Sequence, residues 1–197
     1  MEETKKLETN QIEQSWLEKI AFDLLIALGG SIFLALLSQV SIPLPFTPVP
    51  LTLQTFGVFI LGGTLGGKRA LMSIAAYLVQ GTCGLPVFAG GLSNPLWLLD
   101  YKGGFLISFL PAAFFIGNWI RNKTHASFYY IVFSLAIGQL LIFAIGASWL
   151  AFYVGFVKAI HFGILPFLSG AGLKIIMAAC SLKGIAFLRN RRSLCPK

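Results

Sequence analysis

Lys174 is the side chain whose place in the sequence most strongly suggests chemistry. It lies about eight residues into the apolar stretch 166–188, roughly 12 Å along a helix. An ionisable group inside a membrane span costs about 2.5–3.5 kcal/mol, so its presence favours a functional role. A lysine at this depth can also extend its ammonium to the membrane surface, and this snorkelling interpretation stays open. If Lys174 faces an outward pocket instead, its ammonium suits a substrate carboxylate.

Two irregular segments, 41–54 and 84–104, carry further groups that could bind a small molecule. Both are interrupted by prolines or paired glycines, and such backbone is tolerated at membrane depth only where it lines a cavity or packs on protein. Their amides, aromatic rings and single acid are typical of small-molecule sites, although an interfacial aromatic belt would also explain the rings. The predicted substrate-binding residues are Gln54, Phe88, Gly90, Gly91, Asn94, Asp100, Tyr101 and Lys174.

Groups that could support catalysis are sparse. Asp100 is the only acid after Asp23, which excludes a paired-carboxylate mechanism in the membrane body. His125 and His161 lie far apart and the cysteines show no C-x-x-C spacing, so no metal site is expected. The sequence also lacks a Walker motif. It therefore predicts no enzyme, no cofactor and no metal, but a protein that binds or carries something.

The composition is that of a membrane protein. Of the 197 residues, 56% are hydrophobic and only 11% are charged, whereas soluble domains carry about 25% charged residues. We expect an all-α integral membrane protein with six transmembrane helices in a domain over 20–188, preceded by a cytoplasmic segment (1–19) and followed by a basic cytoplasmic tail (189–197). The predicted spans are 20–40, 51–65, 70–82, 104–120, one within 128–157, and 166–188.

The distribution of basic residues predicts the orientation. Of the 15 Lys and Arg residues, twelve lie on one side: in the N-terminal segment, in the loops after the second and fourth predicted spans, in the tail, and at Lys183 near the end of the last span. Only Lys102 and Lys158 lie in the opposite loops. By the positive-inside rule both termini are cytoplasmic. Because the basic residues are spread between apolar stretches, nucleic acid is not an expected partner.

One face of the first predicted span is made of small residues. Ala27, Ser31 and Ala35 recur every four residues. Such faces allow close contact between helices in lipid. The pattern alone fits contact with another protein and packing inside the bundle equally well.

At two of these places the sequence resembles a known family. The segment IPLPFTPVPLTLQTFGV (42–58), followed by GLPVFAGG (84–91), is similar to the BioY family, the biotin-binding S components of energy-coupling factor transporters. A Gly-Gly pair at 103–104 and PFLSG at 166–170 before Lys174 agree with the resemblance, which covers about 20–188.

The resemblance implies a six-helix bundle in the bacterial cytoplasmic membrane that captures biotin from outside. It implies as partners an EcfT-like transmembrane coupling protein and two ABC-type ATPases, whose ATP hydrolysis drives uptake. In that family the small-residue face of the first span meets the coupling protein, and Ala27, Ser31 and Ala35 match that face in position and spacing.

Two departures from the family pattern concern the binding site. The family motif Pro-Gly-Asp-x-x-Lys corresponds here to Ser169-Gly170-Ala171-Gly172-Leu173-Lys174, which keeps the lysine and loses the acid. The family's Pro-Thr-Gly-Gly-Tyr corresponds to Tyr101-Lys102-Gly103-Gly104-Phe105. We hypothesise that Asp100 supplies the acceptor lost at Ala171, because no other outward carboxylate exists.

Other functions stay open beside biotin capture. The altered motifs leave room for a biotin precursor or another vitamin as the substrate of an S component. A ligand-free membrane assembly protein is a second alternative, against which the polar residues of the outer segments count. A facilitator that works without partners is also conceivable.

Overall fold

The computed structural model describes residues 2–121, 123 and 126–193, and places side chains for 16–121, 123 and 126–188. Apart from one short ladder, the described residues form helices and loops. The elements in chain order are α1 (Glu2–Gln39), β1 (Ser41–Ile42), β2 (Leu51–Thr52), α2 (Gln54–Leu65), α3 (Gly67–Thr82), the 3₁₀ turn η1 (Trp97–Leu99), α4 (Gly103–Arg121), α5 (Phe128–Val154), α6 (Phe156–Gly163), the 3₁₀ turn η2 (Leu165–Phe167) and α7 (Leu168–Ser193).

Helices stand at all six predicted places, and at both ends of the chain they extend beyond the predicted spans. The first helix begins at Glu2, so the N-terminal segment and the first span form one helix. The last helix continues to Ser193, into the predicted tail. The basic side chains of the predicted tail are not among those that the structure describes.

The number of complete membrane crossings is a separate matter. Within the described residues, four segments are long and apolar enough to cross a membrane: Trp16–Gln39, Gly103–Arg121, Phe128–Val154 and Phe156–Leu188. Helix α2 has only 12 residues and α3 has 16, so α2 rises about 18 Å. The all-helical membrane fold is confirmed, whereas six crossings stay a prediction.

Apolar side chains cover the outside of the bundle as well as its core. Leu25 on α1 is 69% exposed and Phe152 on α5 is 87% exposed. In contrast, Leu34, Ile74 and Ile116 are completely buried between the helices. A surface of this kind is stable when lipid is the solvent.

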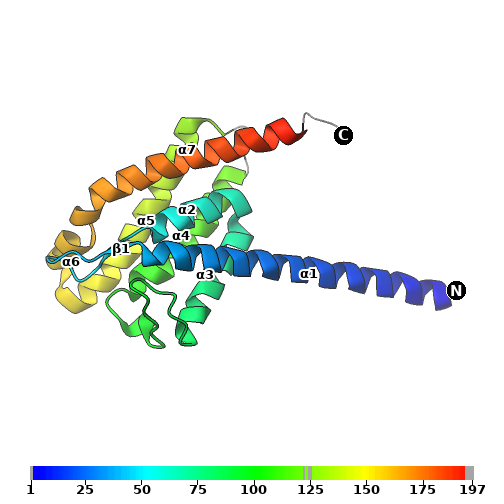
Figure 1. The fold of residues 1–197 in the computed structure, drawn as a ribbon, viewed down its shortest axis with the longest axis horizontal. Coiled ribbons are helices and arrows are strands. Elements are labelled where there is room, and N and C mark those ends of the chain that lie inside the picture. Colours follow the sequence, from blue (N-terminus) through cyan, green and yellow to red (C-terminus); the bar gives the residue numbers. More distant parts are fainter. Residues whose placement is uncertain (1, 122, 124–125, 194–197) are drawn as a thin grey trace.

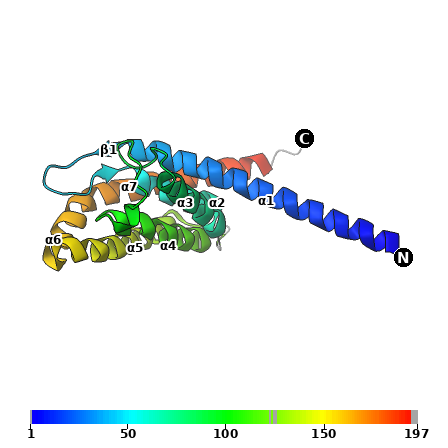
Figure 2. The same cartoon turned by 90° about the horizontal axis from the view of Figure 1, so that it is seen from below.

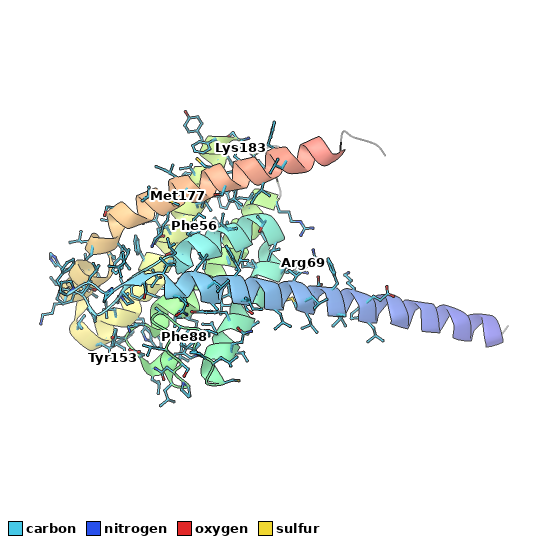
Figure 3. The ribbon with its side chains drawn as sticks, viewed as in Figure 1. Phe56, Arg69, Phe88, Tyr153, Met177 and Lys183 are labelled. Atoms are coloured by element: carbon cyan, nitrogen blue, oxygen red, sulfur yellow. The ribbon has the colours of Figure 1, made fainter. Side chains whose placement is uncertain are left out.

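The two ends of the bundle differ. Figure 1 shows the beginning of α1 and the end of α7 at one end, while the β1–β2 connection and α6 lie at the other. Figure 2 agrees from a second direction. We call the second end, with segments 40–53 and 83–102, the loop end. At the opposite end Arg69 lies beside α1 (Figure 3) and its Nε pairs with Asp23 Oδ1 at 2.8 Å.

In this conformation the small-residue face of α1 is buried inside the helix bundle. Ser31 is completely buried, Ala27 is 4% exposed, and Ala35 packs on the main core. Gln80 on α3 donates a hydrogen bond to Ser31 Oγ at 3.0 Å. The packing interpretation therefore describes this conformation, and contact between this face and a coupling protein stays a prediction that requires α1 and α3 to separate.

Helices α2 and α3 join at a tight turn that packs on α4. Gly66 has a φ of +81°, which suits glycine because it has no Cβ. Gly117 on α4 faces this turn: a Cβ on Gly117 would lie 2.3 Å from Gly67 N and 2.6 Å from Gly66 C. Backbone cannot move aside as a flexible side chain can.

We therefore expect Gly117→Ala to lower the melting temperature of the purified protein in detergent, since overpacking costs about 1–3 kcal/mol. Gly184→Ala is the matched control, because a Cβ on Gly184 meets nothing within 4 Å. Equal melting temperatures for the two variants would contradict the tight contact.

Candidate functional site

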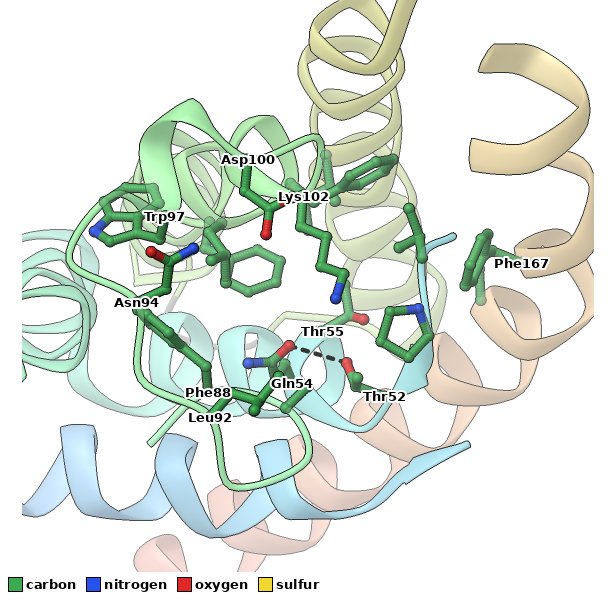
Figure 4. A pocket seen from close by; sticks show the side chains of 18 of the residues that line it. Thr52, Gln54, Thr55, Phe88, Leu92, Asn94, Trp97, Asp100, Lys102 and Phe167 are labelled. Carbon is green, nitrogen blue, oxygen red and sulfur yellow. Dashed lines mark hydrogen bonds between the residues drawn. The ribbon is translucent and has the colours of Figure 1, made fainter. Parts of the chain in front are cut away.

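A cavity of about 260 Å³ lies at the loop end, among α2, α4, α5, α7 and the two irregular segments. Figure 4 shows it from close by, with Asp100 and Lys102 reaching in from one side and Thr52 and Gln54 from the other. The residues that line it are Val49, Pro50, Thr52, Gln54, Thr55, Phe88, Ala89, Leu92, Ser93, Asn94, Trp97, Asp100, Lys102, Phe105, Leu106, Phe109, Gln139, Ile142, Phe167, Ala171 and Lys174.

Segment 83–102 is held over the cavity by hydrogen bonds to α1. Ser38 Oγ donates to the carbonyl of Val87 at 2.6 Å, and Gln39 Nε2 donates to the carbonyl of Phe88 at 3.3 Å. The Phe88 ring is buried edge-on against Tyr77, with centroids 5.6 Å apart. These contacts place an aromatic wall on one side of the cavity.

The second half of the same segment is fixed by α3 and α5. Trp97 Nε1 donates to Thr82 Oγ1 at 2.8 Å. On α5, Trp149 Nε1 donates to the carbonyl of Asp100 at 3.1 Å, and the Tyr153 hydroxyl donates to the carbonyl of Leu99 at 2.5 Å. Because its backbone is tied in this way, Asp100 presents its carboxylate to the cavity (Figure 4).

Segment 40–53 closes another side. Its two ends pair in a short antiparallel ladder, Ser41 with Thr52, and Thr47 Oγ1 at its tip donates to the carbonyl of Phe162 at 2.7 Å. The proline-rich connection therefore crosses from α1 to the region of α6, and the ladder positions Thr52 and Gln54 at the cavity wall.

The amide of Gln54 is already engaged by the protein. Its Nε2 donates to the hydroxyl of Tyr77 at 2.5 Å, and its Oε1 accepts from Thr52 Oγ1 at 3.1 Å. Gln54 is 5% exposed. This network holds the amide in one orientation, as a rigid binding site requires.

Lys174 faces the cavity and not the membrane surface. Its side chain is 8% exposed, and Nζ donates to Thr55 Oγ1 at 3.4 Å, beyond the usual 2.7–3.2 Å of an N–H···O bond. Snorkelling therefore does not describe this conformation. The ammonium keeps donors for a ligand.

Five of the eight predicted substrate-binding residues line the cavity: Gln54, Phe88, Asn94, Asp100 and Lys174. Gly90 and Gly91 do not; they are exposed, and their φ angles of +78° and +71° turn the loop that carries Phe88. Tyr101 also lies outside the cavity, in a small apolar cluster with Phe143.

Lys102 and Gln139 are the most important lining residues that the prediction missed. From the sequence, Lys102 was expected only as a charge of an outer loop and as part of the altered motif 101–105. Gln139 is an amide within an apolar stretch, and a polar group within a span is a signal of function. Ala171, where the family resemblance leads one to expect an acid, does line the cavity.

A lipid-exposed helical bundle that encloses a cavity of mixed polarity at one end is a multi-pass membrane protein built to bind a small molecule. The BioY family model matches residues 6–191. The biotin transporter BioY of Thermotoga maritima is 39% identical over 139 residues, 70% of this chain and 81% of that relative. The biotin transporter BioY2 of Lactococcus lactis subsp. cremoris is 36% identical over 171 residues, 84% and 88% of the two chains.

A solved structure is similar as well. The S-component for biotin from an ECF-type ABC transporter superposes with a TM-score of 0.76 at 27% identity, over 88% of this chain and 93% of that one. The chain belongs to the BioY family. Since this is a family of transporters, the expectation that the chain is not an enzyme is confirmed.

The environment of Lys174 predicts a conflict between stability and binding. We expect Lys174→Met to raise the melting temperature of the ligand-free protein in detergent, because the buried ammonium has one long hydrogen bond and an apolar side chain of similar size avoids its desolvation. Lys158→Met is the control, since Lys158 is exposed on α6. A lower melting temperature for Lys174→Met alone would mean that the lysine stabilises the fold.

Proposed function

We propose that this chain is the biotin-binding S component of an ECF-type transporter and captures biotin from outside the cell. The observation that carries the proposal is the cavity at the loop end, in a member of the BioY family. Its lining offers hydrogen-bond donors, acceptors and aromatic rings together.

The chemistry of biotin matches this lining. Its ureido group has two N–H donors and a carbonyl acceptor, its thioether ring is apolar, and its valerate chain ends in a carboxylate. The amide of Asn94 donates and accepts, Phe88 and Phe105 can cover the ring, and Lys102 and Lys174 each offer an ammonium. Asp100 remains our proposed substitute for the hydrogen-bond acceptor absent at Ala171. Among the described residues, it provides the one carboxylate that lines the cavity.

Purified protein is therefore expected to bind biotin, and both Lys174→Ala and Asp100→Ala are expected to weaken binding more than about tenfold, because hydrogen bonds to charged groups contribute about 1.5–3 kcal/mol. Titration calorimetry in detergent measures this, with Lys158→Ala as the control. Dethiobiotin and thiamine serve as competitors.

Each result has a separate meaning. Absence of biotin binding would overturn the proposed function, and stronger binding of a competitor would redirect it to a precursor or another vitamin. Affinity within twofold of the unaltered protein in one variant would remove that residue from the site.

The given sequence has no nucleotide-binding motif, so ATP-driven uptake would need ATPases from partner proteins. We propose that an EcfT-like coupling protein and ABC-type ATPases supply the driving force. Labelled biotin should then accumulate only in cells that also express these proteins. Accumulation without them would favour a solitary facilitator.

We further propose that the chain crosses the cytoplasmic membrane of a bacterium six times, with α2 and α3 as short crossings and both termini in the cytoplasm. The positive-inside distribution of lysine and arginine supports this orientation, as does the position of the α1 start and the α7 end at one end of the bundle (Figure 1).

Native cysteines allow a test of the orientation. Cys83 is exposed after α3, at the loop end. With Cys180 and Cys195 replaced by serine, Cys83 should react with a membrane-impermeant maleimide on intact cells. The reciprocal variant, which keeps only Cys195, should react only after permeabilisation. The reverse pattern would invert the topology.

A further inference from the structure

Gln139 is a polar residue in an apolar helix face. It lies on α5, about midway between Phe128 and Val154, and lines the cavity. Its neighbours on the buried face are Leu135 and Ile142, one turn away on either side. The side chain is 6% exposed, so its amide cannot obtain its hydrogen bonds from bulk solvent.

The amide oxygen of Gln139 lacks a partner. Among the described residues, Gln139 Oε1 is the one buried side-chain nitrogen or oxygen without a hydrogen bond. The other buried polar group on this face, Ser134 Oγ, donates to the carbonyl of Tyr130 at 2.8 Å. A buried acceptor without a donor is costly, more so within a bundle surrounded by lipid.

The contrast with Gln54 indicates what this oxygen is for. Both glutamines are buried and line the same cavity. The amide of Gln54 is bonded on both sides, to Tyr77 and Thr52, whereas Gln139 Oε1 is left free. In this conformation Oε1 itself is closed off from the cavity. A half-turn of the terminal amide, which exchanges its oxygen and nitrogen, would present a neutral acceptor there and select a ligand that carries an N–H or O–H group at that place.

We propose that Gln139 is a specificity-determining residue, whose Oε1 accepts a hydrogen bond from a ureido N–H of the substrate. This inference rests on the proposed function, because the ureido group is that of biotin. An amide acceptor fits a neutral cyclic urea: it takes the proton donor of the ring without adding a charge to the apolar wall around it.

Three ligands and three variants test the assignment. The ligands are biotin and biotin methylated at one or the other ureido nitrogen, which removes one donor. Gln139→Leu and Gln139→Met remove the acceptor with little change in volume. Gln80→Leu is the control, since Gln80 is an engaged amide of α3 that does not line the cavity.

We expect Gln139→Leu and Gln139→Met to weaken biotin binding about tenfold, in line with the loss of a partner for a buried donor. The ligand-free melting temperature should stay unchanged or rise, because an unpaired acceptor is removed. The preference for biotin over one of the methylated forms should shrink by a similar factor. Gln80→Leu should alter neither the affinity nor this preference.

The outcomes separate the two proposals. If the unaltered protein does not bind biotin, the proposed function fails and the ligand assigned to Gln139 fails with it. If the unaltered protein binds biotin and both Gln139 variants bind it within twofold, only the role assigned to Gln139 is wrong. A fall in melting temperature with an unchanged preference for biotin over its methylated forms would give Gln139 a structural role and likewise overturn the inference.

Discussion

Every backbone N–H and C=O of this chain must find a partner although lipid surrounds most of it. Helices meet this requirement internally, but segments 40–53 and 83–102 cannot. Side chains of neighbouring helices bind their backbone instead, as Ser38 does for Val87 and Trp149 does for Asp100. The irregular segments are thereby fixed over the bundle, and the space that they enclose is the cavity. The position of the site thus follows from the hydrogen bonds that satisfy the backbone of these two segments.

Close contacts between helices also hold the irregular segments in place over the cavity. Gly104 at the start of α4 lies where a Cβ would be 2.1 Å from Trp149 Cβ, so α4 and α5 approach closely beside the site. That approach brings Trp149 near segment 83–102, where it holds the Asp100 carbonyl. Without a hydrophobic driving force between helices in lipid, such packing of small residues is a main source of cohesion. Helix contact and loop position are therefore coupled.

Much of the fold was predictable because apolar run length and breaker residues are local properties. The runs placed all six helices, and the prolines of 41–54 marked one irregular segment. Whether Ala27 and Ser31 face α3 or a partner depends on contacts between distant segments, which a single helix pattern cannot reveal. Likewise Tyr101 follows Asp100 directly but packs elsewhere, since neighbouring loop residues point in different directions. Gln139 could have been predicted as a functional residue, because it is a polar group within a span, but the long apolar run around it obscured this.

The polar residues of the cavity divide into two groups by how the protein uses them. Thr52 and Gln54 bond each other, and Gln54 also bonds Tyr77 behind the wall, so that this group fixes the shape of the wall. Gln139 and Lys174 are left with an unused acceptor and spare donors, an arrangement that reduces stability without a ligand. A binding protein gains specificity from such groups, because a ligand that satisfies them recovers the cost and one that does not is rejected. The residues with unused hydrogen-bonding groups, more than those whose groups are all engaged, therefore determine which molecule the cavity accepts.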